Sequence, residues 1–207
     1  VYIMNLLIIS TSQRAHSQSA KVAKYIAETS FLSPHSVGYD AIHHLELCQF
    51  NLPFWDGEED NKGEHWPEIE QRVDAADALV LITPEWGGMA SPLLKNFLLM
   101  CSRQETAHKP VLLISVCSGI SGAYPIVEVK MNALKNNKLV PIPDHLIIRN
   151  VENVLNATPQ GSRDIDLRER VQYSLFMLHQ YAQALAPIRQ RHIHQPYPKQ
   201  QEYCYGM

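Results

Sequence analysis

Short apolar runs recur along this chain, and most of them are followed by a polar loop and a helical pattern. The runs at residues 4–9, 78–82 and 110–116 consist mostly of Leu, Ile and Val. Nearly continuous runs of this length are typical of strands that are buried on both faces, as in a parallel sheet covered by helices. The pattern therefore predicts three central strands.

Two further strands are predicted from weaker patterns, over residues 36–42 and 139–148. The second of these contains Pro141 and Pro143. Because proline cannot donate a hydrogen bond to a neighbouring strand, these two residues indicate an edge position or an irregular start.

Helical patterns separate the predicted strands. Ala20, Ala23, Ile26 and Ala27 follow the first strand and form a face of small residues that can pack closely on a sheet. Further helices are predicted over residues 67–76, 93–103, 124–136 and 163–185, and residues 45–63 are expected to be irregular.

Strands that alternate with helices at this spacing predict βαβ units and an α/β fold with a parallel sheet. Five such strands favour a flavodoxin-like three-layer sandwich with the strand order 2-1-3-4-5. We expect one domain over residues 1–186. Residues 187–207 carry prolines, glutamines and histidines, and are expected to form a C-terminal arm or a disordered tail.

Composition narrows the possible classes of protein. The chain has 207 residues, of which 45% are hydrophobic and 19% charged, and its formal net charge is −3. This balance excludes a disordered chain and lacks the basic footprint of a nucleic-acid-binding protein. No apolar run approaches the ~18–20 residues that cross a bilayer, so we expect no membrane span.

The cysteines and the N-terminus indicate a compartment. Four cysteines (Cys48, Cys101, Cys117 and Cys204) show no C-x-x-C spacing and are interpreted as reduced thiols. The first residues show no signal-peptide pattern. We therefore expect a cytoplasmic protein.

Ligands of an open α/β sheet bind beyond the carboxyl ends of its strands, where the strand order reverses. In the order 2-1-3-4-5, this position brings together the loops at residues 10–19, 83–92 and 117–122. We therefore expect the ligand-binding residues of the protein in these three loops.

The first loop has the features of a phosphate site. It contains Arg14 and runs into a helix start, where free N–H groups and the helix dipole favour an anion. Further O–H donors are Ser12, Ser17 and Ser19. The alternative interpretation is an ordinary helix start capped by Ser17 or Gln18, with solvated hydroxyls.

The other two loops have the features of a site for a flat ligand. Trp86, Gly87 and Gly88 follow the clearest buried strand, and an aromatic ring with two glycines suits a ligand held close to the backbone. The alternative is a tight turn in which Trp86 covers the core. The third loop offers Ser118, Gly119 and N–H donors, or is an ordinary turn. Together the loops suit a ligand with a phosphate and a planar ring, as in FMN.

These residues resemble the NAD(P)H-dependent FMN reductases of the flavodoxin-like fold. Residues 11–19 read T-S-Q-R-A-H-S-Q-S and are similar to the family pattern G-S-x-R-x-x-S-x-N. Residues 83–96 read T-P-E-W-G-G-M-A-S-P-L-L-K-N and keep the T-P-E start, the L-K-N end and the length of T-P-E-Y-N-x-S-x-P-G-x-L-K-N. Residues 52–56, L-P-F-W-D, resemble the family's L-P-x-Y-D.

The resemblance implies an enzyme that passes a hydride from NAD(P)H to bound FMN and then electrons to a small-molecule acceptor, such as free flavin, a quinone or an azo compound. No catalytic side chain is implied, because the flavin N5 carries the chemistry. The implied phosphate ligands are Ser12, Arg14, Ser17 and Ser19. The implied ring contacts are Pro84, Glu85, Trp86, Gly87, Ser118 and Gly119.

The resemblance also implies a homodimer or homotetramer. The predicted helix over residues 93–103 offers Leu94, Phe97, Leu98 and Cys101, which form either a contact with a second copy or one face of the core.

Two other functions stay open. A flavodoxin-like electron carrier would bind FMN without its own nicotinamide site, although the small net charge disfavours it. A flavin-free interaction protein of the same fold is suggested by Gly87, Met89 and Pro92, which depart from the family pattern. We expect no metal site, because the adjacent His43 and His44 would point to opposite faces of a strand.

Overall fold

A computed structural model of the chain describes residues 3–32, 38–200 and 202–203. Its five strands form one parallel sheet of order β2-β1-β3-β4-β5, which confirms the predicted fold and strand order. The strands are β1 (Asn5–Ser10), β2 (Ala41–Glu46), β3 (Ala78–Pro84), β4 (Pro110–Val116) and β5 (Val140–Ile148). The α-helices are α1 (Gln18–Leu32), α2 (Trp66–Ala75), α3 (Pro92–Met100), α4 (Arg103–Thr106), α5 (Ala123–Glu128) and α6 (Gly161–His194). Short helical turns are η1 (Leu47–Gln49), η2 (Glu59–Asn61), η3 (Val129–Ala133) and η4 (Val151–Asn153).

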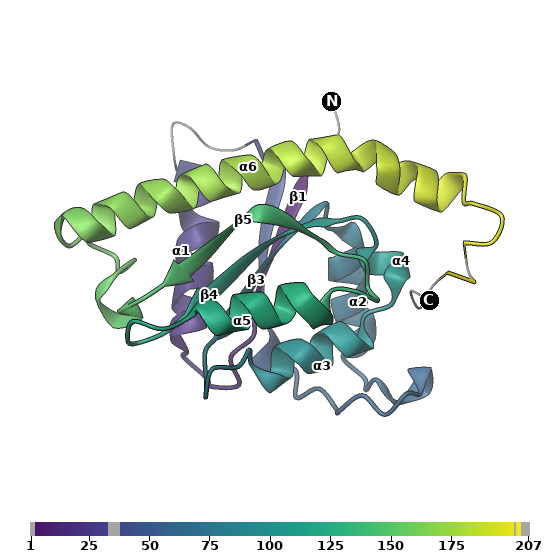
Figure 1. The fold of residues 1–207 in the computed structure, drawn as a ribbon, viewed down its shortest axis with the longest axis horizontal. Helices are drawn as coiled ribbons and strands as arrows, with labels where there is room; N and C mark the ends of the chain where they lie inside the picture. Colours follow the sequence, from purple (N-terminus) through teal and green to yellow (C-terminus); the bar gives the residue numbers. More distant parts are fainter. Residues whose placement is uncertain (1–2, 33–37, 201, 204–207) are drawn as a thin grey trace.

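Alternate residues of each central strand point into two separate cores. Leu6 and Ile8 of β1 face the core shared with α1 and α6, whereas Leu7 and Ile9 face the core shared with α2 and α3. Figure 1 shows α6 running along one side of the sheet, with α3 and α5 on the other. Because both faces of β1, β3 and β4 are buried, these strands have the continuous apolar sequences from which they were predicted.

The prediction for the second strand is wrong. The structure places β2 at Ala41–Glu46 instead of residues 36–42, of which 36 and 37 lie outside the described part. Among the described strands β2 lies at the edge of the sheet and pairs with β1, and Leu45 is the one fully buried side chain within it. An edge strand needs no continuous apolar run, so its position depends on pairing with β1.

The last strand confirms the interpretation of its prolines. β5 lies at the other edge of the sheet, and its register against β4 shifts between Val111 and Leu113.

Two helices end earlier than the patterns predict. α3 stops at Met100, and a separate turn, α4, follows it; after α5 the chain continues as a π-helical turn, η3.

The final helix is longer than predicted. α6 continues past residue 185 to His194, with Pro187 inside it. Arg189 lies two residues beyond this proline, is 7% exposed and donates a hydrogen bond to Asp77 Oδ1 at 2.9 Å. This partly buried ion pair holds the end of the helix on the body of the molecule, so residues 187–194 are helical rather than a disordered tail.

The apolar face of α3 belongs mainly to the core. Leu94 and Phe97 are fully buried and Leu98 is 5% exposed. These residues therefore make up one face of the core, and the alternative that they contact a second copy is wrong for them. None of the helices in the described ranges is long and apolar enough to cross a membrane.

Candidate flavin site

The three predicted loops meet at the carboxyl ends of β1, β3 and β4, around a pocket of about 360 Å³. Eight of the ten predicted cofactor-binding residues line it, namely Ser12, Arg14, Ser17, Ser19, Pro84, Glu85, Trp86 and Ser118. Gly87 and Gly119 lie in the same loops but do not line the pocket. Sequence reasoning missed His16, Gln18, Val116, Cys117, Val151 and Glu152. Val151 and Glu152 follow β5. The sequence did not indicate them as pocket residues, because none of the three loop motifs extends to them.

The first loop combines the two interpretations that the sequence left open. Ser17 caps α1, since its Oγ accepts a hydrogen bond from Ala20 N at 3.0 Å. A serine hydroxyl that accepts in this way still has its proton to donate. The first N–H groups of α1 have no partner within the helix and lie at its positive end. The same helix start is therefore both capped and suited to a phosphate.

Two buried polar atoms at this helix start have no partner in the part of the chain that the structure describes. They are Ser19 Oγ and Gln18 Oε1. The Ser19 side chain is only 1% exposed, so its hydroxyl cannot be satisfied by bulk water. Buried polar groups are normally hydrogen-bonded, and a phosphate oxygen would accept the Ser19 proton. The residues present therefore fit the phosphate end of FMN.

Arg14 joins the first loop to the second. Its guanidinium carbon lies 5.3 Å from the centroid of the Trp86 ring. A guanidinium stacked on an aromatic face keeps N–H groups at its edge for an anion. Arg14 is thus placed to bind a phosphate and to hold the aromatic residue of the second loop.

The second loop contains a tight turn. Trp86 and Met89 exchange backbone hydrogen bonds of 3.2 and 3.0 Å, and the intervening Gly87 and Gly88 have φ values of 57° and 73°. Two consecutive left-handed residues define a type I′ turn, which favours glycine at both positions. The two glycines are required by this turn, and it presents Trp86 to the pocket.

A buried network that we did not predict fixes the first and second loops together. Ser91 Oγ donates to Thr11 O at 2.6 Å and accepts from Leu94 N at 3.0 Å, so it caps α3 and ties it to the first loop. Ser91 N also donates to Thr83 Oγ1 at 2.9 Å. The separation of the two loops is therefore set by hydrogen bonds across the sheet edge.

Two carboxylates, Glu85 and Glu152, also line the pocket. Glu85 accepts a short hydrogen bond from Ser121, and its buried Oε1 has no partner among the described residues. Glu152 accepts from Ser118 Oγ at 3.1 Å. Burial and the Glu85 charge raise the pKa of the Cys117 thiol, which makes the thiol a poor nucleophile. These side chains offer acceptors rather than a reactive group.

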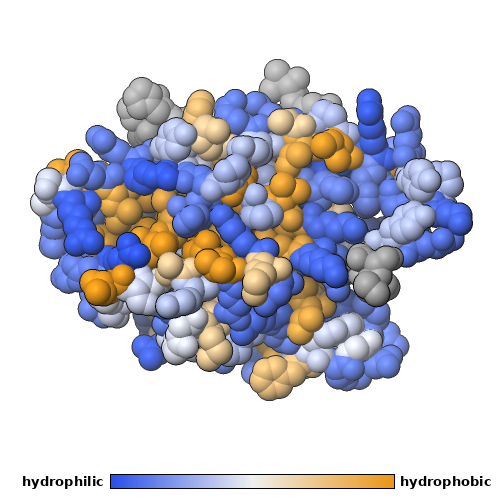
Figure 2. All heavy atoms as spheres, in the orientation of Figure 1, coloured by the Kyte–Doolittle hydropathy of each residue, from blue (hydrophilic) through white to orange (hydrophobic). Residues whose placement is uncertain are grey.

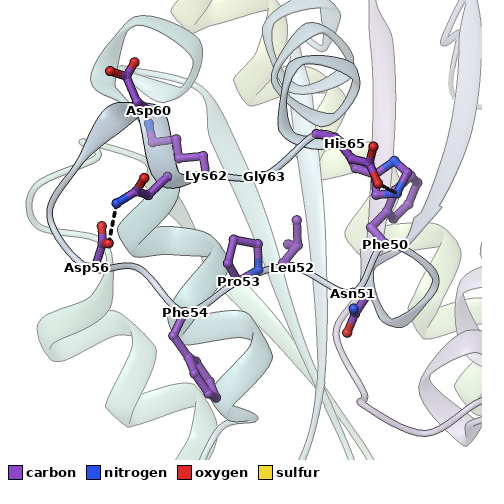
Figure 3. Close-up of a pocket in the computed structure, with 12 residues that line it drawn as sticks. Phe50, Asn51, Leu52, Pro53, Phe54, Asp56, Asp60, Lys62, Gly63 and His65 are labelled. Atoms are coloured by element: carbon purple, nitrogen blue, oxygen red, sulfur yellow. Dashed lines mark hydrogen bonds and ion pairs between the residues drawn. The ribbon is translucent and has the colours of Figure 1, made fainter.

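A larger pocket of about 540 Å³ lies elsewhere. Figure 3 shows that its lining residues come from the two sides of one loop, which are linked by a hydrogen bond from Asn61 Nδ2 to Asp56 Oδ2 at 2.7 Å. It is not at the reversal of strand order, and none of the unpartnered buried atoms found in the described chain belongs to its lining. The smaller pocket is therefore the candidate cofactor site.

No cluster of three or more His, Cys, Asp or Glu side chains suited to a metal ion occurs within residues 3–32, 38–200 and 202–203. Cys204 lies outside the described residues.

Comparison with known proteins identifies the family. The sequence model of the family described as NADPH-dependent FMN reductase matches residues 4–153. The chain belongs to this family. Its members take FMN as cofactor and NAD(P)H as reductant, so the expected resemblance to the NAD(P)H-dependent FMN reductases is confirmed.

Relatives and solved structures agree with the family. An NADPH azoreductase of Bacillus sp. (strain OY1-2) is 33% identical over 146 residues, which are 70% of this chain and 76% of that protein. An FMN-dependent NADPH-azoreductase of Staphylococcus aureus is 27% identical over 130 residues, 62% of this chain and 68% of that protein. The structure of the NAD(P)H:acceptor oxidoreductase FerB of Paracoccus denitrificans has a TM-score of 0.64 at 16% identity, over 88% of this chain and 98% of FerB, and shows a shared fold.

Proposed function

We propose that this FMN reductase-family protein uses NAD(P)H to reduce small-molecule acceptors such as azo compounds, quinones or free flavin, through FMN held in the 360 Å³ pocket. The observation that carries the proposal is the buried Ser19 hydroxyl at the start of α1, which has no partner among the described residues and lines the same pocket as Arg14. The names of the relatives, an NADPH azoreductase and a quinone reductase, support these acceptor classes.

Each side of the pocket has a separate task in this proposal. Ser12, Ser17, Ser19 and Arg14 would bind the phosphate, as charge-assisted donors and hydroxyls at a helix start do. When bound, FMN supplies the atom that accepts the hydride. Pro84, Glu85, Trp86 and Ser118 would flank the ring, with Trp86 fixed by its turn and by Arg14. Gly87 and Gly119 would act through the backbone of the same loops.

The function is tested with two measurements on the full chain. First, the protein is mixed with FMN, and binding is followed by the quenching of flavin fluorescence. Second, the loaded protein is mixed rapidly with NADPH or NADH, and bleaching of the flavin absorbance is recorded before an azo dye or a quinone is added. We expect NADPH or NADH to bleach the flavin absorbance. The absorbance should then recover when an acceptor that the protein can reduce is added. Flavin binding without bleaching would leave only an electron carrier, and the absence of binding would exclude both flavin functions.

Arg14→Ala tests the phosphate assignment. The substitution removes a charge-assisted contact worth about 2 kcal/mol, so the Kd for FMN is expected to rise roughly thirtyfold. Riboflavin, which lacks the phosphate, should lose much less affinity, and the exposed Arg72→Ala serves as a control that changes neither value. An unchanged Kd for FMN in Arg14→Ala would refute the assignment.

We further propose that the protein forms a homodimer through α5 and η3. Tyr124, Val127 and Met131 recur at helical spacing there and are 70%, 59% and 75% exposed, and Ile120 of the adjoining pocket loop is 90% exposed. Figure 2 shows apolar side chains on this side of the molecule, between α5 and α6. Contiguous exposed apolar surface is typical of an interface, and its continuity with the pocket loop favours a second copy as its occupant.

Val127→Asp is expected to convert the dimer to a monomer, because it places a charge in the centre of the apolar contact. Light scattering coupled to size-exclusion chromatography measures the mass. Ile165→Asp, which places a charge on the exposed side of α6, is the control and should leave the mass unchanged. A wild-type chain that elutes as a monomer would contradict this interface.

We also propose that the protein is cytoplasmic. Cys48, Cys101 and Cys117 are free thiols, which supports the expectation of a reducing compartment such as the cytoplasm.

A further inference from the structure

One lysine side chain joins the helix of the phosphate loop to the segment that follows β5. Lys21 lies in the first turns of α1, and its Nζ donates to Val151 O at 2.5 Å, to Val154 O at 2.9 Å and to Asn156 Oδ1 at 2.9 Å. An ammonium group has three N–H donors, so these three acceptors use all of them. The contacts connect residues that are 130 or more positions apart in the sequence.

The segment that Lys21 holds is one wall of the flavin pocket. Val151 and Glu152 line the pocket. The other side of the segment is tied to the loop after β4, because Val151 N donates to Cys117 O at 3.2 Å and Ser118 Oγ donates to Glu152 Oε1 at 3.1 Å. The wall therefore lies between two anchors, α1 on one side and the loop at residues 117–119 on the other.

The charge of Lys21 is matched to its surroundings. Burial lowers the pKa of Lys21, whereas the charges of Glu152 and Asp164 raise it, so nearby carboxylates compensate the ammonium. Removing the amine would leave the carbonyls of Val151 and Val154 without this donor. An acceptor that loses its donor in a partly buried place disfavours the observed conformation of the segment.

We propose that Lys21 is a positioning residue for the flavin pocket, which acts by holding the Val151–Asn153 turn against α1. The proposal rests on the proposed function, since it concerns the same pocket. Lys21 does not line the pocket, and its donors are engaged by the protein. It acts through the wall rather than on the phosphate, so its effect should be the same for flavins with and without a phosphate.

The test compares Lys21→Met with Lys24→Met in the full chain, using FMN and riboflavin as probes. Methionine keeps the apolar stem and loses the three hydrogen bonds, so Kd is expected to rise about tenfold for both flavins. Lys24 is an exposed lysine of the same helix, and its substitution should change neither value. Arg14→Ala provides the contrast, because it should weaken FMN far more than riboflavin.

A second variant guards against a general folding defect in Lys21→Met. Asn156→Ala removes one of the three acceptors and is expected to weaken both flavins in equal proportion, by less than Lys21→Met. Titrations are made well below the unfolding midpoint, which is measured separately by circular dichroism. A purely structural role would lower that midpoint and leave both Kd values unchanged, which would overturn the proposal.

The remaining outcomes are also decisive. If Lys21→Met weakened FMN but not riboflavin, Lys21 would be a phosphate ligand and the positioning role would be wrong. If the wild-type chain bound neither flavin, the proposed function would fail, and this inference with it. If the wild-type chain bound both and Lys21→Met bound them equally well, only this inference would fail.

Discussion

Replacement of Glu105 by glutamine is expected to stabilise the protein at pH 8 by about 3 kcal/mol, and to change its stability little at pH 4. Glu105 lies in α4 and is 3% exposed. Its Oε2 accepts a short hydrogen bond from Ser102, and its buried Oε1 has no partner in the described part of the chain. Burial raises the pKa of Glu105 to about 7; the neighbouring Glu70 adds to this increase, and the Ser102 hydrogen bond opposes it.

The direction of the pH dependence follows from this raised pKa. In the unfolded chain Glu105 has its ordinary pKa of 4.5 and releases its proton first as the pH rises. Between about 4.5 and 7 the folded state therefore holds more protons than the unfolded state, and this group makes the protein progressively less stable. Above 7 both states are ionised and the full cost is present. Glutamine has no proton to release and avoids the cost.

Urea unfolding at pH 4 and pH 8 measures the effect as the difference between variant and wild type. Titrating groups that Glu105 does not influence contribute equally to both proteins and cancel. Lys109, whose pKa burial lowers to about 8 and the Glu105 charge raises, loses this favourable charge in the variant and offsets part of the gain at pH 8. Glu28→Gln on the exposed side of α1 is the control and should give the same difference at both pH values. An equal effect of Glu105→Gln at pH 4 and pH 8 would show that the carboxyl is not buried as the structure has it.

Gly122→Ala is expected to destabilise the protein by about 3 kcal/mol, with part from backbone strain and part from overpacking. Gly122 precedes α5 with a φ of +107°, a conformation that side chains rarely adopt. A Cβ at this position would lie 2.6 Å from Ile147 Cγ2 and 3.2 Å from Ser115 Oγ. Ser115 also donates to Gly122 O at 2.5 Å, so the backbone cannot move away without losing that hydrogen bond.

The same loop supplies the control. A Cβ added at Gly119 would meet no atom within 4 Å, and Gly119 has no positive φ. Gly119→Ala should therefore change stability by about a few tenths of a kcal/mol at most. Thermal unfolding of the two variants in parallel gives the comparison. Because residues 117–122 carry Ser118 and contact Glu85, we also expect Gly122→Ala, but not Gly119→Ala, to weaken FMN binding. Equal unfolding midpoints for the two variants would contradict the crowding at Gly122.

The three central strands were predictable because a strand that is buried on both faces needs apolar residues at nearly every position, which is visible in the sequence itself. β1, β3 and β4 are sandwiched between two cores, so each reads as an apolar run. β2 lies at the edge of the sheet formed by the described strands, and most of its side chains are partly exposed. Its sequence is therefore not a continuous apolar run, and its predicted position was wrong. The end of α6 was missed for a related reason: the Pro187 signal is local, whereas the Arg189–Asp77 pair that holds the helix end is not.

The candidate site also contains residues that the sequence predicted and residues that it did not. Ser12, Arg14 and Ser17 were predictable because a phosphate loop is a short, contiguous motif. Glu152 was not, because it reaches the pocket only through the pairing of β5 with β4 and the hydrogen bonds of Lys21 and Ser118. The Arg14–Trp86 contact joins two motifs that the sequence shows only separately.

The α/β class, the strand order and the family could all be inferred from the chain alone, because apolar periodicity and loop motifs are properties of neighbouring residues. The pairing of β2, the side chains that close the pocket and the buried Oε1 of Glu105, which has no partner among the described residues, became visible only in three dimensions. These features depend on hydrogen bonds between residues that are far apart in the chain, and on the burial of polar groups by such residues. A local sequence pattern does not show which distant residues come into contact.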